Sequence, residues 1–287
     1  MKQLSLFIEL IRLKKPIGFM LLFWPCTWGL TLAYDFSSNL QIYCFYIILF
    51  FLGSVLMRSA GCIMNDILDR DFDKKVSRTK NRPIASGKIS VKRGIIYVTL
   101  LCFLSLLVLL NFNILTILLA LGSMPLAFSY PLMKRFTYWP QLFLGITFNY
   151  GLILGWVCIS SQIELIPIIL YIGAIFWTLG FDTIYGYQDI KDDEIIGVKS
   201  TSIKFKKNPK LFLIICYLVL MMSLILVGLF MKFKLVYYLF LMIPLLHLFL
   251  YQIRNFNSTD PKNSLKIFKA NNLLGAIVLV NILIGKV

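Results

Sequence analysis

The sequence predicts an all-α polytopic membrane protein, and two observations support this fold class. Hydrophobic residues make up 59% of the 287 residues, and the mean hydropathy is +0.81, whereas roughly half of an average soluble chain is apolar. Many apolar segments are also close to the roughly 20 residues that a transmembrane helix needs. Lipid cannot satisfy backbone polar groups, so each such segment is expected to be helical.

We identify nine apolar segments, which we expect to form nine transmembrane helices in one domain covering residues 1–287. They lie at about residues 17–34, 41–64, 94–111, 113–130, 139–160, 164–184, 211–231, 235–252 and 271–285.

The distribution of basic residues predicts the orientation of these spans. The chain carries 29 Lys and Arg residues and a formal net charge of +16. Apart from Arg58, which lies within the second span, all of them except Lys232, Lys234 and Lys286 precede the first span or follow an even-numbered span. By the positive-inside rule, the N-terminus and the even loops face the cytoplasm or the mitochondrial matrix. The basic excess therefore indicates topology and contact with anionic lipid, not nucleic-acid binding.

A first acidic cluster follows the second predicted span. Asn65, Asp69 and Asp73 are spaced four residues apart, so on a helix they form one stripe, with Asp66 beside it. Carboxylates at the edge of the hydrocarbon region are costly and indicate function. Their oxygens suit magnesium, which usually shares its coordination shell with substrate phosphate. The alternative is a solvated acidic loop neutralised by its basic neighbours, Arg70, Lys74 and Lys75.

A second acidic cluster follows the sixth predicted span. Asp189 and Asp193 are one helical turn apart, and Tyr185 precedes them by one turn. Asp182 lies near or inside the bilayer, where the alternative to a functional role is a structural ion pair with a basic neighbour. Both clusters follow even-numbered spans, so we expect them to converge on one face although more than a hundred residues separate them. Each follows the second span of a four-span block, which suggests a four-helix internal repeat.

Basic residues accompany both clusters. Arg82 follows the first cluster and Lys199 the second, and both side chains are suitable phosphate donors. Arg58 lies two turns before Asn65, where the helix is still within the bilayer. No phosphate-binding GxxxxGK[ST] motif and no GxGxxG motif after a strand occurs in the sequence, so nucleotide binding is not indicated.

Both clusters match known motifs. Residues 65–73 read NDILDRDFD, which fits NDxxDxxxD, and residues 189–193 read DIKDD, which fits DxxxD. The chain therefore resembles the UbiA superfamily of intramembrane prenyltransferases. Shorter motifs are similar to its 4-hydroxybenzoate polyprenyltransferase branch: residues 12–18, 57–62, 78–83, 130–135, 182–185, 197–201 and 268–272.

This resemblance implies a nine-helix bundle around a central cavity that is open to lipid. It also implies magnesium-assisted transfer of a polyprenyl group from its diphosphate to 4-hydroxybenzoate, at the ring carbon ortho to the hydroxyl, as in ubiquinone synthesis. The implied metal ligands are Asp66, Asp69, Asp73, Asp189 and Asp193, and Asn65 assists them. The implied diphosphate contacts are Lys199, Arg82 and Arg135. The expected substrate contacts are Arg58, Asp182 and Tyr185. Arg58, an intramembrane arginine, is our candidate for binding the benzoate carboxylate, and the alternative is that it pairs with a structural carboxylate.

The resemblance further implies an integral protein of the bacterial or mitochondrial inner membrane, with its site on the cytoplasmic or matrix face. It implies no obligatory protein partner and no nucleic acid. Within the enzyme class, the alternative is a related prenyltransferase with a naphthoate, haem or tetrapyrrole acceptor. From another class, the alternative is a transporter that uses intramembrane aspartates for cation coupling.

Overall fold

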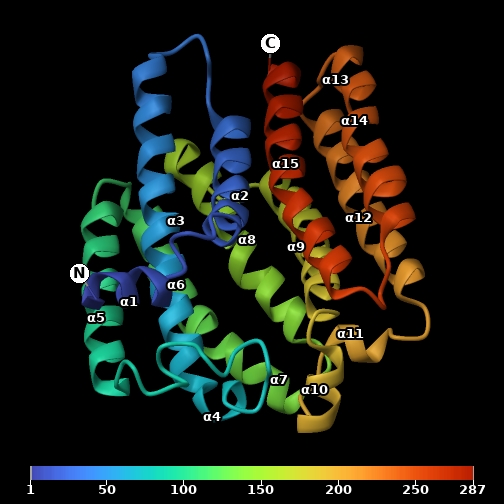
Figure 1. The fold of residues 1–287 in the computed structure, drawn as a ribbon. Coiled ribbons are helices and arrows are strands. Elements are labelled where there is room, and N and C mark those ends of the chain that lie inside the picture. The colour runs from blue at the N-terminus through green and yellow to red at the C-terminus, as the bar shows by residue number, and fades with distance from the viewer. Residues whose placement is uncertain (1, 287) are drawn as a thin grey trace.

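The computed structural model describes residues 2–286, and throughout that range the chain folds into helices without strands (Figure 1). The helices of the first half are α1 (Lys2–Leu10), α2 (Ile17–Ala33), α3 (Leu40–Leu68), α4 (Arg70–Asp73), α5 (Val91–Leu109), α6 (Ile114–Ser129) and α7 (Met133–Phe136). Those of the second half are α8 (Pro140–Ser160), α9 (Leu165–Gly186), α10 (Ile190–Ile196), α11 (Thr201–Lys204), α12 (Pro209–Phe230), α13 (Leu235–Phe240), α14 (Met242–Leu246) and α15 (Pro261–Lys286). A 3₁₀ turn (Tyr130–Leu132) joins α6 to α7, and a π-helix (His247–Ile253) continues α14.

A helix lies at every predicted span. Eight helical segments of the described chain are long and apolar enough to cross a membrane, and α2, with 17 residues, is a shorter apolar helix. The largest difference is at the last span, which was predicted to begin at residue 271 whereas α15 begins at Pro261. Its first turns carry Lys262, Lys266 and Lys269. Hydropathy detects only the apolar part of a helix, so the polar start of α15 was missed.

The centre of the bundle depends on close contact between α2 and α8. A Cβ atom at Gly29 would overlap the backbone carbonyl of Leu152, and one at Gly155 would overlap the carbonyl of Cys26. Small residues let helix backbones approach closely in membranes, where helix association depends on packing rather than on water exclusion. Glycine at these positions therefore fixes α2 against α8.

Helices α9, α12 and α15 complete this core around α2 and α8. The buried indoles of Trp28 and Trp177 lie 5.0 Å apart. Trp28 donates to the carbonyl of Gly275 (3.0 Å), and Trp177 donates to the side chain of Asn271 (2.7 Å). These hydrogen bonds fasten α15 to both α2 and α9.

Helices α3, α5 and α6 are packed less tightly, and they form one side of the molecule in Figure 1. Fewer than a fifth of the residues in their central windows are buried, compared with more than half for α8, α9 and α12. Helix α5 packs on α3 and α6 packs on α8, but α5 and α6 make few contacts with each other.

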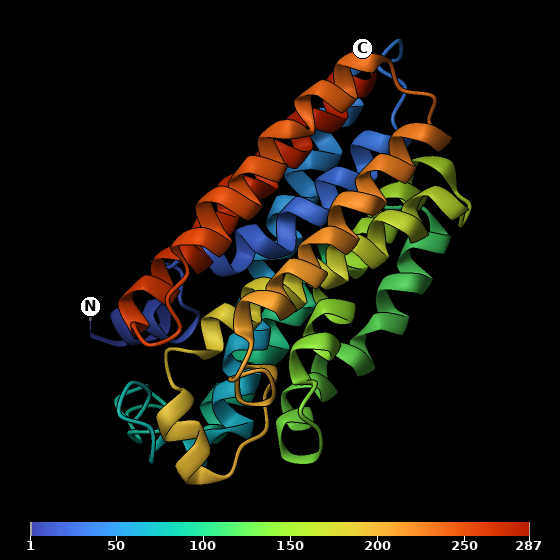
Figure 2. The ribbon, with the colours of Figure 1, turned by 90° about the vertical axis from the view of Figure 1, so that its right-hand side faces the viewer.

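The short helices α4 and α10 lie at the same end of the bundle in both views, and the C-terminal end of α15 lies at the opposite end (Figures 1 and 2). The acidic clusters are in and beside α4 and α10. The prediction that both clusters reach one face is therefore confirmed.

Candidate active site

The first acidic cluster is formed where α3 ends. Helix α3 stops at Leu68, and Asp69 (φ −97°, ψ 5°) joins it to α4. Asn65, Asp69 and Asp73 therefore do not lie on one unbroken helix, although the amide of Asp73 still donates to the carbonyl of Asp69 (2.8 Å). The break turns the chain inward, and Asp66, Asp69 and Asp73 are all buried.

Two arginines compensate the charge of Asp66 and Asp73. The Arg12 guanidinium donates to Asp66 Oδ1 (2.5 Å), and Arg82 bridges Asp66 (3.1 Å) and Asp73 (2.8 Å). A buried carboxylate without such partners is strongly destabilising. Arg12 precedes α2 and Arg82 follows α4, so two connecting segments are held against the end of α3.

Lysine 134, at the start of α7, compensates the third carboxylate. Its Nζ lies 2.5 Å from Asp69 Oδ2, whereas Asp69 Oδ1 is buried and has no hydrogen-bond partner. Burial raises the pKa of Asp69, and the charge of Lys134 opposes that shift. One oxygen of Asp69 thus remains available to a ligand.

The second cluster is joined to the first by the segment that follows α4. Arg78 forms a forked contact with the Asp189 carboxylate, with Nε 2.8 Å from Oδ1, and also donates to the Tyr185 hydroxyl (3.2 Å). The backbone amide of Ser77 donates to Asp192 (3.2 Å). The two motifs therefore form one polar site.

Asp193 lies one turn beyond Asp189 and has no basic partner within 4 Å in the described chain. Burial, together with the negative charge of Asp189, raises the pKa of Asp193 from its ordinary 3.8 to about 6. This carboxyl group titrates close to neutrality, where a bound cation would favour its ionised form.

The solvated-loop alternative holds for one residue only. Asp71 is 73% exposed and pairs with Arg70 (3.3 Å) and Lys74 (3.0 Å). The motif carboxylates instead pair with residues from other segments. The alternative is therefore wrong for Asp66, Asp69 and Asp73.

The predicted basic residues are placed differently from one another. Arg82 lies within the carboxylate cluster, but Arg135 donates to the carbonyl of Leu68 (2.7 Å) at the C-terminal end of α3. Lys199 Nζ donates to the carbonyl of Phe136 (3.3 Å). Both of these side chains thus hold backbone carbonyls beside the site.

Three ion-pair partners received no site role from the sequence: Arg12, Arg78 and Lys134. Arg78 and Lys134 were noted only as members of short motifs, and Arg12 lies more than fifty residues from its partner. Their positive charge was the one sequence signal that could have indicated a site role. Many other Lys and Arg residues on the predicted cytoplasmic face carry the same charge, so the signal did not single these three out. Within residues 2–286, the side chain of Asn65 forms no hydrogen bond that would assign it a role.

Arg58 lies deeper, on α3, at the edge of an apolar cavity. Its guanidinium stands 5.2 Å from the centre of the Phe148 ring, and its Nε is buried without a hydrogen-bond partner. A Cβ at Gly18 would lie 2.8 Å from that Nε, so the absence of a side chain at this position leaves room for the guanidinium. Asp182 interacts electrostatically with Arg58 but forms no ion pair with it.

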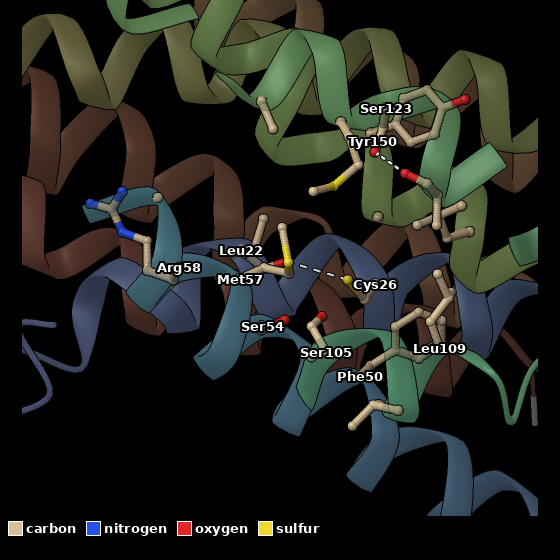
Figure 3. A pocket seen from close by; sticks show the side chains of 18 of the residues that line it. Leu22, Cys26, Phe50, Ser54, Met57, Arg58, Ser105, Leu109, Ser123 and Tyr150 are labelled. Carbon is tan, nitrogen blue, oxygen red and sulfur yellow. Dashed lines mark hydrogen bonds between the residues drawn. The ribbon is translucent and has the colours of Figure 1, made fainter. Parts of the chain in front are cut away.

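The cavity has a volume of about 230 Å³ and lies among α2, α3, α5, α6 and α8. Figure 3 shows Arg58 at one end and Phe50 and Leu109 toward the other. Its walls are mainly apolar, with a few hydroxyls such as those of Ser54 and Ser105. A hydrocarbon chain suits such walls better than a charged ligand does.

A hard divalent cation fits the donor set of the acidic clusters. Among residues 2–286, no three Asp, Glu, His or Cys side chains converge closely enough to form a metal site as they stand. Nevertheless, the donors are carboxylate oxygens, which magnesium prefers, and Asp69 Oδ1 is a buried acceptor without a partner.

Comparison with known proteins identifies close relatives along nearly the whole chain. The UbiA prenyltransferase family matches residues 22–273. The chain is 41% identical to 4-hydroxybenzoate geranyltransferase 2 of Lithospermum erythrorhizon, over 99% of this chain and 92% of that protein. It is 42% identical to the mitochondrial 4-hydroxybenzoate polyprenyltransferase of Bos taurus, over 99% of this chain and 76% of that protein.

Solved structures share the fold. The apo structure of a UbiA homolog from Aeropyrum pernix K1 aligns with a TM-score of 0.76 at 22% identity, covering 93% of this chain and 97% of that one. A UbiA homolog from Archaeoglobus fulgidus bound to GPP and Mg²⁺ aligns with a TM-score of 0.70 at 18% identity, covering 97% and 98%.

Removing the arginine that bridges two carboxylates should destabilise the protein. Arg82→Met leaves Asp73 without an ion-pair partner in a buried position, which typically costs about 3–5 kcal/mol. We expect a clearly lower midpoint of thermal unfolding in detergent. Arg70→Met, which removes a partner of the exposed Asp71, is the matched control and should leave the midpoint unchanged. Equal shifts for the two variants would contradict the role given to Arg82.

Magnesium binding should weaken as the pH falls through about 6. Below that pH the Asp193 carboxyl is protonated, and a proton competes with the cation for it, so the apparent dissociation constant should rise about tenfold per pH unit. In the metal-free protein, the raised pKa of Asp193 changes folding stability in the opposite direction. It favours folding at low pH, and this contribution to stability declines as the pH rises from about 4 to about 6.

The measurement is the magnesium-induced rise in unfolding temperature at pH 5, 6 and 7. Asp193→Asn should remove the pH dependence that this carboxyl contributes. The same magnesium affinity at pH 5 and pH 7 in the unmodified protein would be the contradicting result.

Proposed function

Because the chain belongs to the UbiA prenyltransferase family, we propose that it transfers a polyprenyl group from polyprenyl diphosphate to 4-hydroxybenzoate. The new bond forms at the ring carbon ortho to the hydroxyl. The observation that carries this proposal is the position of two acidic motifs, joined at one end of the bundle, beside an apolar cavity. Relatives with this activity in their names match 99% of the chain.

The diphosphate binds among the polar groups of the two motifs. Arg78 and Lys134 contact Asp189 and Asp69, and both cations suit phosphate oxygens. Arg82 is held between two carboxylates, so its main effect is to fix their positions. Arg135 and Lys199 hold backbone carbonyls and add positive charge nearby.

Magnesium is held by carboxylates of both motifs, namely Asp69, Asp73, Asp189 and Asp193, with Asp66 and Asn65 in support. When bound, it acts as a Lewis acid that stabilises the negative charge of the departing diphosphate. Arg12 and Arg82 hold Asp66 and Asp73 in place, and Lys134 and Arg78 do the same for Asp69 and Asp189.

The prenyl group occupies the apolar cavity. When the allylic carbon–oxygen bond breaks, the resulting carbocation must be shielded from water, and the apolar walls provide this shielding. The phenol ring then attacks through its electron-rich carbon next to the hydroxyl.

Arg58 positions the acceptor by binding the benzoate carboxylate. Support comes from its place at the cavity edge and from its buried, unpaired Nε. The structural alternative, a pair with a carboxylate, is not formed by Arg58 within residues 2–286. Asp182 thereby keeps a carboxylate that can accept the ring proton in the last step, and Tyr185 lies one turn away on the same helix.

The positive-inside rule places both motifs on the cytoplasmic or matrix face of an inner membrane. Relatives named for geranyl and for polyprenyl donors are almost equally similar to the chain.

The proposed metal carboxylates are tested by single amide substitutions. Asp69→Asn and Asp189→Asn should each lower prenylation of 4-hydroxybenzoate at least about a hundredfold, because a metal supplies several kcal/mol of transition-state stabilisation. Asp71→Asn is the matched control, since Asp71 belongs to the same acidic run but pairs at the surface. Product is measured by mass spectrometry on isolated membranes with magnesium. Normal turnover in both Asp69 and Asp189 variants would refute the assignment.

The acceptor is identified by the same assay when the membranes are supplied with a naphthoate, a haem and 4-hydroxybenzoate. Product with naphthoate or haem alone would retain the reaction class and refute the acceptor.

The role of Arg58 is tested with two acceptors. Arg58→Ala should raise the KM for 4-hydroxybenzoate about tenfold or more, since a hydrogen bond between charged groups contributes about 1.5–3 kcal/mol. The KM for the prenyl donor should change much less. The variant should also lose its preference for 4-hydroxybenzoate over the uncharged 4-hydroxybenzamide. A larger change in the donor KM would instead place Arg58 at the diphosphate.

A further inference from the structure

One face of α3 forms a floor along the cavity, and two of its residues are glycines. Gly53, Met57 and Gly61 follow one another at intervals of four residues and all line the cavity. A Cβ atom at Gly53 or Gly61 would meet nothing within 4 Å. By contrast, the glycines between α2 and α8 have backbone directly against them. Close helix packing therefore does not explain Gly53 and Gly61, whereas open space in the cavity does.

The end of the cavity far from Arg58 is closed by aromatic rings. Phe50 and Phe112 both line it, and their ring centres lie 5.0 Å apart. Phe112 also lies 5.4 Å from Tyr46, between centres, which extends this closure. A hydrocarbon chain in the cavity thus meets a barrier before the far surface of the membrane.

The wall between α5 and α6, in contrast, is loosely packed. These two helices make few contacts with each other. Leu106 on α5 and Leu121 on α6 both line the cavity and are 37% and 48% exposed, so neither is packed into the protein core. The volume of about 230 Å³ is below the roughly 300–1,000 Å³ of pockets that enclose drug-sized ligands. A tail of many five-carbon units must therefore leave the cavity.

We propose that Gly53 determines which prenyl tails this enzyme accepts, by keeping open the passage from Arg58 to the gap between α5 and α6. The first units of the tail lie in the cavity, and the remainder passes Gly53 and continues into the bilayer. Tail length is then limited by the width at position 53 and not by a closed end. This inference rests on the proposed prenyl transfer.

The two glycines are at different depths, which makes the proposal testable by position. Gly61 is eight residues from Gly53, about 12 Å along the helix, and lies closer to the acidic motifs. A large side chain at position 61 obstructs the beginning of the tail, whereas one at position 53 obstructs only its continuation. Gly122 on α6 is the matched control: it also has open space around it, but it is exposed and does not line the cavity.

The experiment compares Gly53→Phe, Gly61→Phe and Gly122→Phe with dimethylallyl, geranyl and long polyprenyl diphosphates. Gly53→Phe should lower kcat/KM for the long donor about tenfold or more, since the added ring fills space that the long tail needs and overpacking is costly. The kcat/KM for dimethylallyl diphosphate should stay within about threefold of that of the unmodified enzyme. Gly61→Phe should reduce the values for all three donors, and Gly122→Phe for none. Replacing glycine inside a helix does not by itself destabilise it, and thermal unfolding confirms that each variant is folded.

The proposal is overturned if Gly53→Phe leaves the ratio of kcat/KM for the long donor to kcat/KM for the short donor unchanged, whether or not both values fall. These ratios are measured with whichever aromatic acceptor the unmodified enzyme prenylates. A wrong acceptor assignment would therefore leave this test intact. No turnover by the unmodified enzyme with any donor or acceptor would refute the proposed function itself, and the inference with it.

Discussion

The burial of three carboxylates at the end of α3 is the constraint on which the site depends. Asp66, Asp69 and Asp73 are nearly inaccessible, and an uncompensated buried charge costs several kcal/mol. Compensation comes from three other segments: the one before α2, the one that follows α4, and α7. The charges that suit a metal–diphosphate ligand therefore also hold the connecting segments of this face in place.

The two motifs are connected less firmly than each is held internally. Arg82 is 18% exposed and pairs with nearly inaccessible carboxylates, whereas Arg78 is 38% exposed where it meets Asp189. Solvent weakens an exposed ion pair, so the contact between the motifs is the easier one to exchange for a ligand.

The sequence predicted the spans and the convergence of the acids because both follow from average properties, hydropathy and the distribution of charge. It did not predict which base meets which acid, because that depends on side-chain direction in short segments. Lys134 and Arg135 are adjacent on α7, and successive helical residues point about 100° apart. One side chain consequently reaches Asp69, and the other reaches the carbonyl of Leu68. The start of α15 was missed for a related reason, since its first turns are polar.

Stability and substrate access are divided between the two halves of the bundle. Helices α8, α9, α12 and α15 enclose the large buried core and, with α2, contain the close glycine contacts and the tryptophan hydrogen bonds. Helices α3, α5 and α6 bury little and leave a cavity with a lipid-facing wall. If the predicted four-helix repeat exists, its two copies have taken different roles. A substrate dissolved in the bilayer needs a loosely packed wall, and a tightly packed half can supply the stability which that wall lacks.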